Sequence, residues 1–178
     1  MHIPDQPKRR KFLKIASAGS IASAAGGFPS LFVSNQAAAQ ELLGGETFST
    51  LTKIARDIFP HDDFNDELYA KAVAIYGDQI KENPDLGKLL INGVASANAA
   101  GMKQFGKPYA QIPDEKSRLV ILTAMTSTPF FAKVRGDLVV SLYNQPVVWG
   151  KLGYQGPSAE FGGYISRGFN DQNWMNLV

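Results

Sequence analysis

Prolines that follow capping residues divide most of this chain into helical segments. Asn83-Pro84 and Thr128-Pro129 each place a helix-capping side chain before a proline, and Pro60 ends an earlier segment of helical apolar periodicity. Proline is favoured at the first position of a helix and stops a helix that precedes it. No stretch has the alternation and length of a confident strand. The sequence therefore predicts an all-α fold: a compact bundle of about five helices with an irregular C-terminal tail rich in glycine and aromatic residues.

The expected helices follow from apolar residues that recur at spacings of three and four. They cover residues 48–59, about 66–82, 84–105, about 115–126 and about 129–144. We expect Thr47 to cap the first helix, after a polar lead-in over 40–47, and Asp63 or Asn65 to cap the second.

Two of these helices carry features that predict their packing. In the 48–59 helix, the face opposite the apolar residues includes Lys53, Arg56 and Asp57, and we expect it to face solvent. The 84–105 helix is rich in glycine, alanine and serine, which allow another helix to approach closely. Glycine inside a helix costs about 1 kcal/mol of helix propensity, so close packing is expected to compensate for it.

The N-terminal segment has the pattern of a twin-arginine export signal. A weakly apolar run over 15–33 follows the basic residues, and Ala37 and Ala39 offer small side chains for signal cleavage. A membrane-spanning helix, which needs about 20 mostly apolar residues, is the alternative, but this run contains four glycine or proline residues and several serines. We therefore interpret residues 1–39 as the signal peptide. The residues that define the motif are Arg9, Arg10, Phe12 and Leu13.

The net charge of the rest of the chain does not favour nucleic acid as a partner. Residues 1–39 hold five of the 18 Lys and Arg residues and one of the 16 Asp and Glu residues. This leaves 13 bases and 15 acids in residues 40–178, a formal net charge of −2. Nucleic-acid-binding domains typically carry a strong positive excess.

The composition also limits the cofactors that this chain can hold. It contains no cysteine, which excludes c-type haem attachment, cysteine-ligated iron–sulfur clusters and thiolate zinc sites. It has no glycine-rich dinucleotide-binding motif and no phosphate-binding loop. The twin-arginine route carries folded proteins, often with a cofactor already bound. We therefore expect no cofactor on this chain and a cofactor on a partner that travels with it.

His61, the one histidine of residues 40–178, lies among acidic side chains. A metal site or an acid–base pair is one interpretation, although one histidine with clustered acids has no spacing that defines a coordination geometry. We favour a turn in which the acids cap the next helix and His61 makes a structural or interfacial hydrogen bond. The alternatives kept open are a stand-alone periplasmic enzyme or metal-binding protein centred on His61, and a purely structural periplasmic protein.

The tail, residues 146–178, combines glycines with aromatic side chains, which is unlike the composition of disordered segments. Aromatic and arginine side chains are enriched at the energetic centres of interfaces. The rings either cover the domain's own core or contact a partner, and both can hold for different rings. The residues that we expect to bind a partner are Trp149, Tyr154, Tyr164, Arg167 and Phe169.

Two stretches of the tail, WGKLGYQGP over 149–157 and GGYISRGF over 162–169, are its most specific patterns. Together with LTKIARDIFPHD over 51–62 and the twin-arginine signal, they resemble the gluconate 2-dehydrogenase subunit 3 family over nearly the whole chain. The resemblance implies a non-catalytic small subunit of a membrane-associated, FAD-dependent dehydrogenase that oxidises sugars, sugar acids or alcohols.

The same resemblance implies the partners. The large subunit would be a flavoprotein of the glucose–methanol–choline type that holds the FAD, and a multihaem cytochrome c can accept its electrons. The small subunit would supply the signal for the twin-arginine translocase and assist assembly of the flavoprotein, in the periplasm and at the inner membrane through the complex. The implied division of the chain is a signal peptide over 1–39, a helical domain over 40–145 and a partner-wrapping tail over 146–178.

Overall fold

The computed structural model describes residues 29–163, with only the backbone described at 29–34 and 161. The chain divides into two units, Met1–Ser30 and Leu31–Val178, and the core contacts join residues of the second unit. The described elements are α2 (Pro29–Leu43), α3 (Gly45–Ile58), α4 (Asp66–Ala74), α5 (Tyr76–Glu82), α6 (Pro84–Phe105), the 3₁₀ helix η1 (Tyr109–Gln111), α7 (Glu115–Met125), α8 (Pro129–Ser141), α9 (Pro146–Lys151) and the 3₁₀ helix η2 (Ser158–Phe161). The described residues form no strand, and the all-α prediction is confirmed.

The proline and capping signals mark the observed helix starts. The Asn83 side chain accepts a hydrogen bond from the backbone N–H of Asp85 (3.2 Å), and the Thr128 hydroxyl accepts one from Phe131 (3.2 Å). Of the two candidate caps before α4, Asn65 is the one that accepts a backbone hydrogen bond, from Leu68 at 3.3 Å. The cap residues therefore satisfy backbone donors that the first turn leaves without a helical partner.

The helix expected over 66–82 is divided at Ile75 into α4 and α5. Ile75 keeps helical dihedral angles (φ −56°, ψ −27°). Its carbonyl accepts hydrogen bonds from both Asp78 (3.3 Å) and Gln79 (3.2 Å). The division is thus a change in hydrogen-bond pattern, which the apolar periodicity of the sequence does not record.

The segment expected to be a polar lead-in, residues 40–47, is helical except at Gly44. Residues 40–43 belong to α2, a helix that continues across the expected boundary after Ala39. Gly44, with φ +83°, separates α2 from α3, and α3 begins at Gly45, so Thr47 does not cap a helix. Positive φ strains any residue with a side chain, and glycine therefore allows the sharp change of direction here.

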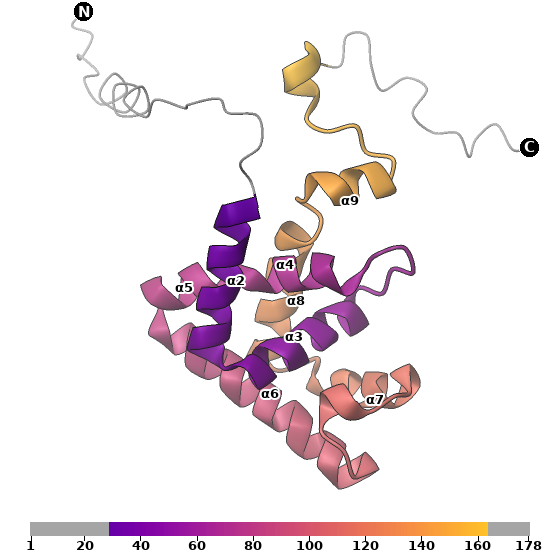
Figure 1. Ribbon diagram of the computed structural model, residues 1–178. Coiled ribbons are helices and arrows are strands. Elements are labelled where there is room, and N and C mark those ends of the chain that lie inside the picture. Colours follow the sequence, from indigo (N-terminus) through magenta and orange to yellow (C-terminus); the bar gives the residue numbers. More distant parts are fainter. Residues whose placement is uncertain (1–28, 164–178) are drawn as a thin grey trace, which may run out of the picture. The chain divides into compact units, whose positions relative to one another are not determined.

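Helix α3 lies at the centre of the packing, in contact with α4, α6, α7, α8 and η1. Its apolar face is buried as predicted, with Leu51, Ile54 and Ala55 fully inaccessible to solvent. Figure 1 shows the long helix α6 running past α3 to α7. The aromatic residues Tyr69, Tyr76 and Tyr109 are also buried and belong to the same core.

The prediction for Asp57 is wrong, because this residue is 4% exposed instead of facing solvent. Both carboxylate oxygens accept hydrogen bonds from Arg118 of α7, Nε to Oδ2 at 2.7 Å and Nη2 to Oδ1 at 2.9 Å. The Tyr109 hydroxyl donates to Oδ2 at 2.7 Å. Arg118 Nη1 donates to the carbonyls of Ile112 and Pro113. Asp57 is buried because α7 and η1 supply these donors, and neither is adjacent to it in sequence.

The small residues of α6 allow the close approach that the sequence predicts. A Cβ added at Gly93 would lie 2.1 Å from the ring of Phe130 on α8, well inside van der Waals contact. A Cβ at Gly101 would lie 2.6 Å from the carbonyl oxygen of Lys107. These contacts bring α8 and the loop before η1 directly onto the backbone of α6.

We predict that stability decreases at alkaline pH, in part through Tyr109. Burial, and then the charge of Asp57, raise the pKa of the Tyr109 hydroxyl above that of an exposed tyrosine. The unfolded chain releases this proton near pH 10 while the folded chain keeps it, so the contribution is complete below about pH 10 and is lost above it. The free energy of unfolding should fall by up to about 1.4 kcal/mol per pH unit for each such tyrosine.

Urea unfolding between about pH 8 and about pH 11 measures this slope. Tyr109→Phe should make the slope shallower by up to about one proton, while Tyr154→Phe, at an exposed position, serves as the matched control. Equal slopes for Tyr109→Phe and the unchanged protein would contradict the assignment.

Candidate functional site

The first part of the tail is attached to the helical domain through α9. Val148 is fully buried, and the indole N–H of Trp149 donates to the carbonyl of Tyr143 at 2.7 Å. The side-chain amide of Gln145 donates to the carbonyls of Leu68 (3.0 Å) and Ser141 (3.1 Å). Helix α9 therefore belongs to the same packed unit as α4 and α8. The patterns in the sequence predicted no helix here.

The turn that follows α9 packs around Trp149. The ring of Tyr154 meets it edge to face, with ring centroids 5.6 Å apart, and the Tyr154 N–H donates to the Trp149 carbonyl at 2.8 Å. At Gly156 the backbone has φ +94°, and a Cβ there would lie 3.7 Å from the indole ring. The WGKLGYQGP stretch is thus a turn built around a half-buried tryptophan, because glycine supplies the conformation that this turn needs.

Of the five residues expected to bind a partner, Trp149 and Tyr154 are described and differ in exposure. Trp149 is partly covered by its own domain, whereas Tyr154 is 48% exposed. Tyr164, Arg167 and Phe169 lie outside the described residues. The Trp149 side chain therefore packs partly on its own domain, whereas Tyr154 leaves about half of its surface open to solvent.

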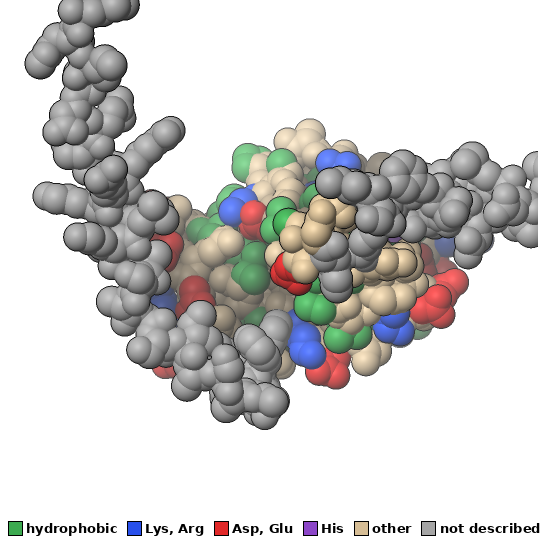
Figure 2. Space-filling view, turned by 90° about the horizontal axis from the view of Figure 1, so that it is seen from above, with side chains coloured by type: hydrophobic (Ala, Val, Ile, Leu, Met, Phe, Trp, Pro, Cys, Tyr) green, Lys and Arg blue, Asp and Glu red, His purple; other side chains and the backbone are tan. Residues whose placement is uncertain are grey.

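Exposed apolar side chains cluster where α8 ends and α9 begins. We define the α8–α9 surface as Val139 (50% exposed), Val140 (65%), Val147 (59%), Leu152 (52%) and Tyr154 (48%). Val139, Val140, Leu152 and Tyr154 line a shallow groove with Tyr143, Asn144, Trp149 and Pro157. A second groove, on the side of α4 and α5, also includes Val140 and is lined by Val147 and Gln145. Figure 2 views the protein from above and shows hydrophobic side chains beside charged ones on that side.

Charged groups lie beside this apolar surface. Lys151 donates to the carbonyl of Asp63 at 2.8 Å, which joins α9 to the turn after α3. Asp137 of α8, which lines the second groove with Val140 and Val147, forms an ion pair with Lys133 at 2.9 Å. An apolar centre with a polar rim is the usual arrangement of a protein–protein interface. The α8–α9 surface therefore has the chemical character of a docking surface.

His61 is hydrogen-bonded to Tyr143, which lines the first groove, with Nε2 and the hydroxyl oxygen 2.7 Å apart. Its ring stacks on Phe64 at 4.3 Å between centroids. Burial raises the pKa of the Tyr143 hydroxyl. The structural hydrogen bond that we favoured for His61 is present. Among residues 29–163 there is no group of three or more His, Cys, Asp or Glu side chains arranged to hold a metal ion.

Sequence reasoning missed the role of Tyr143. Its hydroxyl contacts His61, its carbonyl accepts the Trp149 indole hydrogen bond, and its ring packs edge to face on Phe59 (5.7 Å). Tyr143 thereby connects the turn after α3 with α9. Only the fold brings residues 61 and 149 to the same side chain.

The residues expected to form the signal lie partly outside the described chain. Arg9, Arg10, Phe12 and Leu13 are outside it. Ala37 and Ala39 lie inside α2, where Ala37 is exposed and Ala39 is fully buried. No helix within the described residues has the length and apolar character needed to cross a membrane.

Comparison with known proteins gave no match among protein-family models, curated proteins or solved structures.

We predict that Tyr143→Phe destabilises the protein by about 1 kcal/mol, because His61 loses its hydrogen-bond partner at a half-buried position. Urea unfolding measures the change. Tyr154→Phe removes an exposed hydroxyl on the same surface, and its effect should stay within about 0.5 kcal/mol. Equal effects of the two substitutions would contradict a structural role for the Tyr143 hydroxyl.

Proposed function

We propose that this chain is the non-catalytic small subunit of a periplasmic FAD-dependent sugar, sugar-acid or alcohol dehydrogenase complex. It supplies the twin-arginine signal for both chains and stabilises the flavoprotein. The flavoprotein of the glucose–methanol–choline type holds the FAD and carries out the oxidation, and a multihaem cytochrome c can receive the electrons. The complex associates with the inner membrane. Its substrate is chosen on the flavoprotein.

The observation that carries this proposal is the α8–α9 surface. It exposes five large apolar side chains, of which Leu152 and Tyr154 lie in the WGKLGYQGP stretch that contributes to the family resemblance. Apolar patches rimmed by polar groups mark interaction sites on folded proteins. A protein partner with a complementary apolar patch explains why these side chains are kept at the surface.

The internal contacts of this region support a docking role. Trp149 and Tyr143 are held by hydrogen bonds of 2.7 Å, and Val148 is buried beneath them. A surface that is already ordered loses little conformational entropy when a partner binds. Binding to the folded flavoprotein and not to its unfolded form would stabilise it by mass action. This is the effect that an assembly subunit needs.

We predict that Val140→Lys/Val147→Lys lowers the amount of flavoprotein that co-purifies with this chain at least tenfold, equivalent to about 1.4 kcal/mol or more of binding free energy. Charges placed in the centre of an apolar interface lose their hydration without gaining partners. The chain, tagged after Val178, is purified from solubilised membranes of its host. Bound flavin and dye-linked dehydrogenase activity are measured in the eluate.

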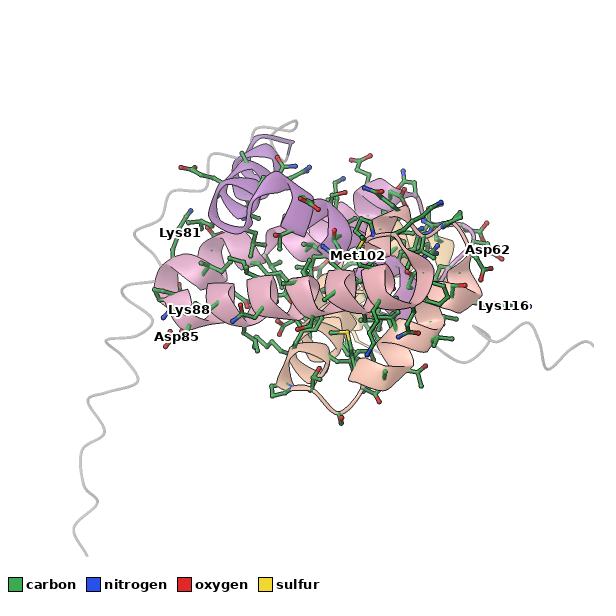
Figure 3. All side chains as sticks on the ribbon, turned by 90° about the horizontal axis from the view of Figure 1, so that it is seen from below. Asp62, Lys81, Asp85, Lys88, Met102 and Lys116 are labelled. Carbon is green, nitrogen blue, oxygen red and sulfur yellow. The ribbon has the colours of Figure 1, made fainter. Side chains whose placement is uncertain are left out.

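The matched control is Met102→Lys on α6. Met102 is 54% exposed and lies on the face of α6 seen in Figure 3, where Lys88 and Asp85 mark the start of the helix. This control should leave co-purification unchanged. An equal loss with Met102→Lys would contradict the α8–α9 surface as the docking site, and a chain that elutes without any flavoprotein would contradict the proposed function.

We also predict that Arg9→Lys/Arg10→Lys leaves both chains in the cytoplasm, because the paired arginines are the recognised feature of the signal. Cell fractionation with antibodies against each chain measures this result. The control is Lys8→Arg/Lys11→Arg, which keeps the charge and the arginine pair and should export both chains. Normal export of the double Arg→Lys variant would overturn the export part of the proposal.

A further inference from the structure

Helix α2 is part of the packed domain, although its residues up to 39 were expected to be removed as a signal. The described side chains of α2 contribute Ala39, fully buried, and Leu43, 4% exposed, to the same core as α3 and α6. Gln36 and Gln40 face a groove that they share with Phe48 of α3 and Ala70 of α4. The helix is continuous through residues 39 and 40, where cleavage was expected.

The contact between α2 and α5 depends on a glycine. A Cβ added at Gly77 would lie 2.6 Å from the carbonyl oxygen of Asn35 and 2.9 Å from the backbone nitrogen of Ala39. It would also lie 3.3 Å from the Cβ of Ala38. Two of the three groups are backbone atoms, which cannot move aside as a flexible side chain can. Gly77 therefore forms a seat for the backbone of α2.

This seat lies over buried structure. Tyr76, next to Gly77, is 1% exposed, and Ala74 is 1% exposed. Loss of residues up to 39 would remove the fully buried Ala39 and also the backbone that covers Gly77. It would also leave only the last four residues of α2, too few to form a stable helix alone. The domain would lose a helix that closes one side of its core.

Helical structure also protects this segment from proteolysis. A protease cleaves a packed helix only after the helix has opened locally. Because the twin-arginine route carries folded proteins, the Ala37–Ala39 stretch would meet a signal peptidase already folded into α2. Upstream of α2, Ala22-Ser23-Ala24 offers small residues at the same spacing.

We infer that α2 is a permanent element of the folded protein, and that the mature chain begins upstream of Asn35 instead of at Gln40. The statement about processing rests on the proposed export, whereas the seating of α2 on Gly77 does not. Under this inference, residues 35–39 belong to the folded domain and not to the signal peptide.

The first test is the intact mass of the chain purified from the membranes of its host. We expect a mass that corresponds to a first residue before Asn35. A mature chain that starts at Gln40 would overturn the inference. It would leave the proposed function intact as long as Arg9→Lys/Arg10→Lys still retains both chains in the cytoplasm, so the two failures are distinguishable.

The second test is amide hydrogen exchange of the full chain. Amides of residues 39–43 should exchange at least tenfold more slowly than in an unstructured peptide. Gly77→Ala should raise their exchange rates at least tenfold, because the added methyl group displaces the α2 backbone. Protection of α6 should be unchanged, which shows that the rest of the domain remains folded.

The matched control is Gly136→Ala, a helical glycine of α8 whose added Cβ would meet no other part of the protein within 4 Å beyond its chain neighbours and the backbone of its own helix. It should leave exchange in residues 39–43 unchanged. Rapid exchange of these residues in the unchanged protein, or no effect of Gly77→Ala, would overturn the seating of α2. If Gly77→Ala unfolds the whole domain, the intact mass still decides where the mature chain begins.

Discussion

The packing of this domain depends on the buried ion pair between Asp57 and Arg118. Both side chains are almost inaccessible to solvent. Two charge-assisted hydrogen bonds of 2.7 and 2.9 Å join them, and the Tyr109 hydroxyl donates to Asp57 at 2.7 Å. Arg118 also donates to two backbone carbonyls. A buried charge without its partner costs about 3–5 kcal/mol. Helices α3 and α7 must therefore stay in one relative position, because any other arrangement leaves a charge in the core unpaired.

This rigidity extends from α3 to the candidate docking surface. The chain leaves α3 into a turn where Arg56 donates to the carbonyl of Phe64 at 2.8 Å and His61 reaches Tyr143. Tyr143 in turn accepts the indole hydrogen bond of Trp149, and Lys151 of α9 returns to the carbonyl of Asp63. A binding surface held by such supporting contacts keeps its shape before a partner arrives. In our proposal, the exposed apolar residues of α8 and α9 are presented by this framework.

The two ends of the domain share one physical property, close contact at glycine. Gly77 receives the backbone of α2, and Gly156 lies against the indole ring of Trp149. At Gly77 a side chain would push the α2 backbone away, whereas at Gly156 the positive φ of +94° is what disfavours a side chain. The helix-breaking and turn-forming character of glycine was visible in the sequence, but the α2 backbone that approaches Gly77 comes from a distant position and became known only with the fold.

Local signals in the sequence determined the helices, because a cap, a proline and a spacing of three or four act within a single turn. Asn83, Thr128 and Asn65 show this directly. Only the tertiary structure decided which residues of those helices are buried and which groups cover them. Asp57 lies on the face that amphipathicity assigned to solvent, yet α7 covers it with Arg118. In the sequence, Ala39 has the small side chain expected at a cleavage site, yet it is buried in the core beside Gly77 of α5. Both outcomes depend on partners dozens of residues away, and no local pattern contains that information.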